Sequence, residues 1–101
     1  MVIKTAQFEV EENALDECVA AVEAFVGAVD ESEPGTLVDR SLQDVDRPTR
    51  FLHIFIFADD AAEQVHTSGE PVKRFTEVLY SRTLAPVQFQ TWRPVAMVDR
   101  M

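Results

Sequence analysis

Hydrophobic and polar residues follow a two-residue period in several short stretches of the chain. This period is typical of β-strands, in which successive side chains point to opposite faces of a sheet. In the first stretch Ala6, Phe8 and Val10 fall on one side, whereas Gln7 and Glu9 fall on the other. Applied along the chain, such patterns predict four strands, over residues 3–10, 36–43, 51–57 and 87–92.

The stretch 51–57 is apolar on both of its faces. Phenylalanine side chains and His53 occupy one face, and leucine and isoleucine occupy the other. Two helices can cover only one face of a small sheet, so the second face needs another apolar surface. A second copy of the same sheet is the simplest such surface, and we therefore expect a homodimer.

Between the strands, hydrophobic residues recur every three or four positions, as they do in amphipathic helices. A first helix is predicted from an N-cap at Asn13, and its apolar stripe includes Cys18, which we interpret as a core residue. The segment 59–66 begins with two aspartates, which favour the positive end of a helix dipole. A third helix follows, with Pro71 in its first turn.

The order of these elements predicts an α+β fold. Strand, helix, strand, strand, two helices and strand form a ferredoxin-like antiparallel sheet (βαββααβ) with the helices on one face. The second and third strands should pair as a hairpin. Glu33-Pro34-Gly35 is interpreted as a turn before the second strand, because proline fixes φ and glycine tolerates positive φ.

Composition narrows the class of protein. A chain of 101 residues is long enough for one modest core, so we expect a single domain over residues 1–101. The net charge of −9 repels phosphate backbones and anionic lipids, which argues against nucleic acid and membrane partners. The single cysteine, and the lack of a long apolar run or a signal segment, favour a cytoplasmic location.

Three stretches, taken in order, resemble the antibiotic biosynthesis monooxygenase family over nearly all of residues 3–93. They are Glu33-Pro34-Gly35 before the second strand, the aromatic third strand that ends in Phe57, and Asp59-Asp60-Ala61-Ala62 followed by His66 and Phe75. The resemblance implies that two sheets pack face to face as a dimeric α+β barrel. It also implies a cofactor-independent monooxygenase that acts on a small phenolic or quinol-like aromatic compound.

The chain departs from the residues that many family members carry. Asp39 stands where many members have a tyrosine on the second strand, and Phe55 where they have a glutamate on the third. Quinone-forming members can have asparagine and tryptophan at the positions of His53 and Phe57. Two alternatives therefore stay open: a non-catalytic ligand-binding or structural dimer, and an isomerase or decarboxylase that uses the same barrel.

Two histidines are the candidate catalytic residues. His53 lies on an aromatic strand face, where an imidazole can take a phenolic proton or stabilise an enolate; the alternative is a buried histidine bonded to a neighbour. His66 ends a helix, where its charge suits the dipole, and the resemblance adds a role in lining or gating the pocket. An aromatic wall for a flat small aromatic or apolar ligand is expected from Phe51, Phe55, Phe57 and Trp92.

We expect no cofactor and no metal. The chain contains neither a GxGxxG nor a Walker A sequence, so the glycine-rich loops that admit dinucleotides or triphosphates are missing. The spacing of His53 and His66 does not match a recognised metal-binding pattern, and one cysteine cannot supply a thiolate-rich site.

Overall fold

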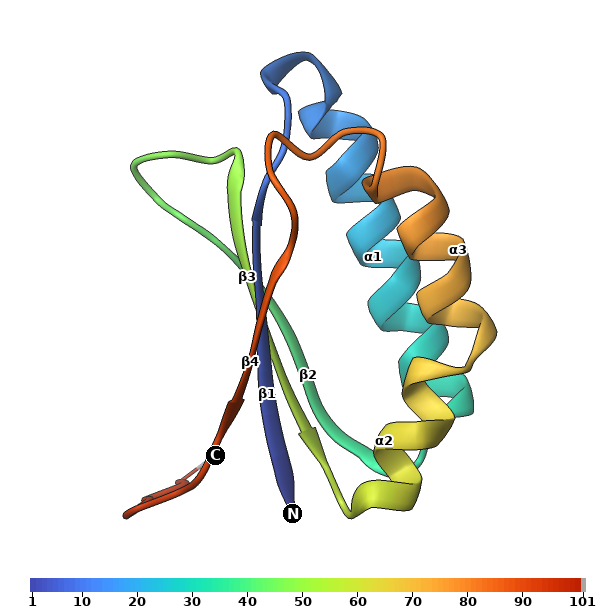
Figure 1. The fold of residues 1–101 in the computed structure, drawn as a ribbon, viewed down its shortest axis with the longest axis vertical. Helices are drawn as coiled ribbons and strands as arrows, with labels where there is room; N and C mark the ends of the chain where they lie inside the picture. Colours follow the sequence, from blue (N-terminus) through green and yellow to red (C-terminus); the bar gives the residue numbers. More distant parts are fainter. Residues whose placement is uncertain (101) are drawn as a thin grey trace.

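The computed structural model describes residues 1–100, in which one antiparallel sheet carries all the helices on a single face (Figure 1). The strands lie in the order β2-β3-β1-β4. This arrangement confirms the predicted α+β, ferredoxin-like fold and the hairpin of the second and third strands. The elements are β1 (Val2–Glu9), a 3-10 turn η1 (Glu12–Ala14), α1 (Leu15–Ser32), β2 (Thr36–Gln43), β3 (Arg50–Phe57), α2 (Asp60–Thr67), α3 (Glu70–Leu79) and β4 (Gln88–Trp92).

The start of α1 differs from the expected N-cap at Asn13. Asn13 lies inside η1, and α1 begins at Leu15 without a side-chain cap. The tight turn provides the hydrogen bond instead, because the Ala14 N–H donates to the Glu11 carbonyl at 3.0 Å. The expected start of the second helix at the two aspartates is confirmed, since α2 begins at Asp60. Asp59 also caps this helix, because its carboxylate accepts from the Ala62 N–H at 2.8 Å.

The core lies between the sheet and the helices. Cys18 of α1 is fully buried in it, as the helical pattern predicted. Along β3 the side chains at odd positions are buried under the helices, whereas those at even positions are half-buried, apart from the exposed Arg50 at the start of the strand. We call these two sides of the sheet the helix face and the outer face. The core comprises Ala6, Phe8, Val10, Ala14, Cys18, Val22, Phe25, Val29, Phe51, Phe55, Phe57, Phe75 and Leu79.

Strand pairing places particular side chains beside one another on the helix face. Phe55 of β3 pairs with Lys4 on β1 and with Asp39 on β2. Because directly opposite residues of antiparallel strands share a face, all three side chains lie on the helix face. The same rule puts His53 beside Ala6.

Gly35 allows β2 to start close to α2. A Cβ atom at this position would lie 2.6 Å from Ala62 Cβ, a distance that real side chains do not tolerate. No glycine among residues 1–100 has positive φ, so the expected backbone reason for a glycine in the turn does not hold. The glycine is required by the close approach of the helix.

None of the helices within residues 1–100 is both long and apolar enough to cross a membrane.

Candidate functional site

A cavity of about 290 Å³ lies between the helix face of the sheet and helices α2 and α3. Its wall is mostly apolar, with few polar groups, as is usual for small-molecule sites. The lining residues that bear on the argument are Lys4, Phe25, His53, Phe55, Phe57, Glu63, His66, Phe75, Tyr80 and Phe89.

Aromatic rings form the inner part of the wall. Phe25 of α1 stacks on Phe75 of α3 with ring centroids 4.7 Å apart and planes inclined by 13°. Phe55 and Phe57, two residues apart on β3, are stacked at 5.9 Å with planes inclined by 6°. These rings offer flat apolar surface to a ligand that is itself flat.

His53 is enclosed by this aromatic wall. Its ring packs against those of Phe8 and Phe75, with centroids 5.2 Å and 5.6 Å away, and the residue is 1% exposed. The Nε2 atom has no hydrogen-bond partner among residues 1–100. Burial, and then the charge of His66, lowers the pKa of His53 from 6.5 to about 4. His53 is therefore a neutral imidazole at pH 7 and a weak base.

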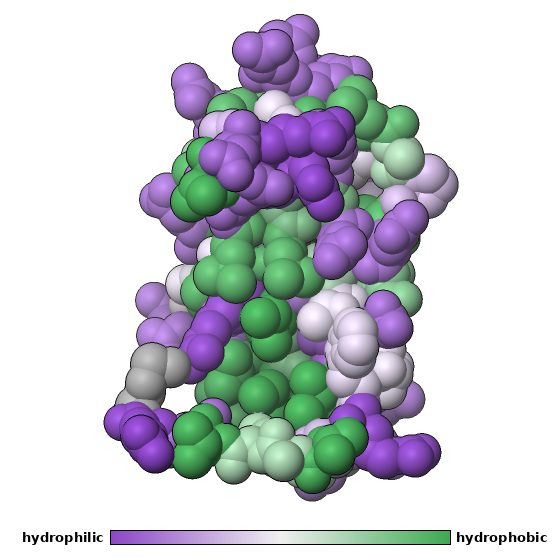
Figure 2. Space-filling model, turned by 90° about the vertical axis from the view of Figure 1, so that its left-hand side faces the viewer, coloured by the Kyte–Doolittle hydropathy of each residue, from purple (hydrophilic) through white to green (hydrophobic). Residues whose placement is uncertain are grey.

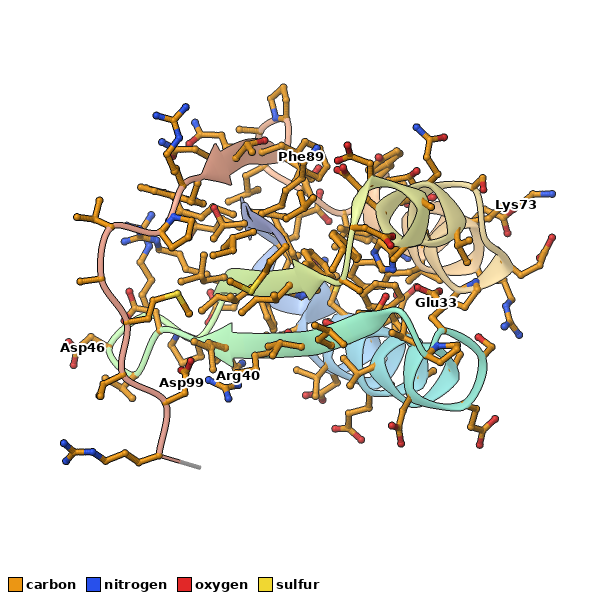
Figure 3. All side chains as sticks on the ribbon, turned by 90° about the horizontal axis from the view of Figure 1, so that it is seen from below. Glu33, Arg40, Asp46, Lys73, Phe89 and Asp99 are labelled. Atoms are coloured by element: carbon orange, nitrogen blue, oxygen red, sulfur yellow. The ribbon has the colours of Figure 1, made fainter. Side chains whose placement is uncertain are left out.

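His66 of α2 forms a buried pair with Glu33, which follows the end of α1. The His66 Nδ1 and Glu33 Oε1 atoms are 2.7 Å apart, and Thr36 Oγ1 donates to the same carboxylate oxygen at 3.0 Å. Figure 3 shows Glu33 between the end of α1 and α2. A carboxylate only accepts, so Nδ1 carries the proton and the lone pair of the neutral ring is on Nε2. His66 also lines the cavity, so the ring that bonds Glu33 is within reach of a ligand.

Glu33 was missed as a functional residue in the sequence, where it was assigned only to a turn. One feature of the sequence could have indicated this role. A carboxylate at the C-terminal end of a helix is disfavoured by the helix dipole, so its presence there requires a compensating interaction. Glu33 is nevertheless 5% exposed, so its charge needs a partner within the fold. His66 is that partner, 33 positions further along the chain.

Asp39 is a second buried carboxyl group on the helix face. Neither side-chain oxygen is exposed, and neither has a hydrogen-bond partner in the described part of the chain. Burial, and then the charge of Glu33, raises the pKa of Asp39 from 3.8 to about 7. The helix face therefore contains an acid with a pKa near neutral, although Asp39 itself does not line the cavity.

Four of the six residues expected at the site lie in the cavity wall: His53, His66, Phe55 and Phe57. The structure places the other two elsewhere. Phe51 stacks on Phe8, with centroids 5.2 Å apart, beyond the end of the cavity. Trp92 pairs with Ile3 on the outer face, where its Nε1–H donates to Thr5 Oγ1 at 2.8 Å. Phe89 of β4 lines the cavity instead.

An ion pair joins two further cavity residues. The ammonium group of Lys4 on β1 contacts the carboxylate of Glu63 on α2. Their side chains are 37% and 17% exposed, respectively, so the pair is within reach of solvent.

Solved structures of low sequence identity share this fold. A protein from Bacteriodes thetaiotaomicron VPI-5482, provisionally named an antibiotic biosynthesis monooxygenase, has a TM-score of 0.90 at 20% identity over 99% of this chain and 94% of its own. A protein from Nitrosomonas europaea with the same provisional name has a TM-score of 0.86 at 15% identity, over 95% of this chain and 100% of its own. The chain has no significant match among curated proteins.

Family membership rests on the sequence itself. A sequence model described as "Antibiotic biosynthesis monooxygenase" matches residues 1–78, which include β1 to β3, α2, the Glu33–His66 pair and the aromatic wall up to Phe75. The chain belongs to the antibiotic biosynthesis monooxygenase family.

Proposed function

We propose that the protein is a homodimeric, cofactor-independent monooxygenase that acts on a small phenolic or quinol-like aromatic compound. One observation carries this proposal: a carboxylate–imidazole pair, Glu33–His66, borders a cavity walled by aromatic rings. The pair can take a proton from a phenol or enol, and the rings can hold the flat, electron-rich anion that results. The cavity volume is close to the lower end of the range for ligand sites, which favours a small compound.

His66 acts as the base in the proposed reaction. Its Nε2 lone pair accepts the substrate proton, and Glu33 stabilises the imidazolium that forms. The substrate anion then gives electrons to dioxygen in a site from which the aromatic wall excludes water. Over the full reaction of an anthrone-like substrate, a CH₂ carbon receives one oxygen atom as a carbonyl. The second oxygen atom leaves with both hydrogens as water, so the substrate supplies every electron.

His53 has a different part in this scheme from the one expected in the sequence. With its pKa lowered to about 4, it is a weaker base than a free imidazole. A neutral imidazole still carries one N–H, which can donate to a substrate oxygen. We therefore assign proton transfer to His66 and substrate positioning to His53.

The outer face of the sheet supports the homodimer. Apolar side chains gather over the middle and lower part of this face, with polar side chains at its upper end (Figure 2). Such a patch on a small domain is typical of an interface, and a second copy offers a surface of the same shape and character. The face-to-face barrel implied by the family resemblance has this arrangement. The apolar residues of the outer face are Ile3, Val38, Leu42, Leu52, Ile54, Ile56 and Trp92.

Oxygen uptake tests the proposed reaction. Purified protein should consume dioxygen when given anthrone-like or quinol substrates, without an added reductant. His66→Gln should lower turnover about 100-fold or more, as loss of a positioned base does. Gln64→Ala, an exposed position on α2, is the matched control and should leave turnover unchanged. If members of the panel bind tightly but none is oxidised, the protein is instead a ligand-binding dimer of the same fold.

A further inference from the structure

The charged groups of the cavity are gathered at one end. Glu63 and His66 are three positions apart on α2 and therefore share one face of that helix. Lys4 reaches Glu63 from β1, and it pairs with Phe55, whose ring centroid is 5.0 Å from that of His66. The ammonium group of Lys4 and the imidazole of His66 thus border the same end of the cavity.

The opposite end of the cavity is apolar. Leu79 at the end of α3, Tyr80 just after it and Phe89 of β4 form its wall there. Among residues 1–100, Lys4 is the only lysine or arginine that lines the cavity. A ligand that fills this space would place its apolar rings toward α3 and β4 and its acidic group toward Lys4.

When His66 takes the proton, its positive charge is offset by Glu33, so the ligand anion still faces the carboxylate of Glu63 unless a second cation lies nearby. Glu33 is bonded to His66, and Glu63 lies one helical turn before it. Lys4 supplies the opposite charge at this end. Its pairing with Glu63 does not prevent this role, because partly exposed ion pairs contribute little to stability and an ammonium group has three N–H donors. Lys4 can therefore keep Glu63 and bind a ligand oxygen as well.

We propose that Lys4 is the anion-binding residue of the cavity and that it selects ligands with an acidic hydroxyl group, phenols or enols, by binding their oxyanion. This inference deepens the proposed function and rests on it for the identity of the substrate. In the reaction, His66 removes the proton and Lys4 stabilises the oxygen that has lost it. No role had been assigned to Lys4 from the sequence.

Binding of 4-nitrophenol tests the proposal without any oxygenation, because the phenolate absorbs visible light and the phenol does not. Titration of the bound probe against pH gives the ratio of phenolate to phenol affinity. In the parent protein this ratio should be high, and in Lys4→Met it should fall at least tenfold. Lys4→Arg keeps the charge and should retain most of the preference. Glu63→Gln removes the competing carboxylate and should increase phenolate affinity.

Lys73→Met is the matched control, since Lys73 on α3 is exposed and points away from the sheet into solvent (Figure 3). It should bind phenolate like the parent protein. Circular dichroism confirms that each variant is folded before binding is measured. An unchanged phenolate preference in Lys4→Met, or a parent protein that binds neither form of the probe, would overturn the proposal. Strong phenolate binding without oxygen uptake would instead support the anion site and contradict the monooxygenase.

Discussion

Replacing Asp39 by asparagine should change how the stability of the protein depends on pH. The side chain is half-buried on β2, and both of its oxygens lack a partner among the described residues. Asparagine has nearly the same shape but cannot ionise. The substitution therefore removes the charge while leaving the packing around α1 and β3 nearly intact.

The direction of the effect follows from the raised pKa of Asp39. In the unfolded chain this carboxyl loses its proton above pH 3.8, whereas in the folded protein it keeps the proton up to about pH 7. The folded state binds more protons between these values, so the stabilisation is present below pH 3.8 and is lost as pH rises through about 7. Each pH unit within this window lowers the free energy of unfolding by about 1.4 kcal/mol.

Between pH 5 and pH 8 this reasoning gives an upper limit of about 3 kcal/mol. Because Asp39 is only half-buried, solvent relaxation reduces the effect, and we expect about 1.5 kcal/mol. Urea unfolding at fixed protein concentration, followed by circular dichroism at both pH values, measures it. The parent protein should lose about 1.5 kcal/mol more than Asp39→Asn on going from pH 5 to pH 8.

Comparison of the two pH changes cancels any cost of burying the asparagine amide, which does not depend on pH. It also cancels the titration of His53, which is present in both proteins. Asp30→Asn, at an exposed position on α1, is the control and should follow the parent protein. If Asp39→Asn also follows the parent protein to within about 0.5 kcal/mol, the carboxyl group is solvated in the folded state and the reasoning is refuted.

Three further predictions concern His53, Gly35 and Ile54. The lowered pKa of His53 should destabilise the parent protein as pH falls from 6.5 toward 4, by about 2 kcal/mol at pH 5, and urea unfolding of His53→Phe should show this loss removed. Gly35→Ala should lower the free energy of unfolding by about 1–3 kcal/mol, because its Cβ meets Ala62, and adding Ala62→Gly should reduce that cost. Ile54→Glu should convert the dimer into a monomer near 11.4 kDa by light scattering, and a parent protein of that mass would contradict the dimer.

The fold could be predicted from the sequence because local patterns and global packing agree. Each strand and helix was expected within a few residues of its observed limits, and β2 was predicted as residues 36–43, the same limits as in the structure. The start of α1 was the weakest point. There a backbone hydrogen bond in η1 replaced the side-chain cap expected from Asn13.

The candidate site was less predictable because its geometry depends on pairing between distant segments. In β4 the alternation places Phe89 on one face and Trp92 on the other, and the sequence does not say which face is covered. Pairing of Ala6 with Phe89 decides it, and turns Trp92 to the outer face. The Glu33–His66 pair has the same origin, since a turn and a helix meet only after the chain has folded.

The two faces of β3 allow substitutions in this strand to act on separate properties of the protein. Odd-numbered residues of this strand point toward the cavity side, and even-numbered residues point toward the outer face. In the proposed dimer, substitutions at odd-numbered positions would alter which ligand is accepted, whereas substitutions at even-numbered positions would alter how the two copies associate. A chain that keeps its family's fold could therefore change its ligand without rebuilding the interface of the proposed dimer.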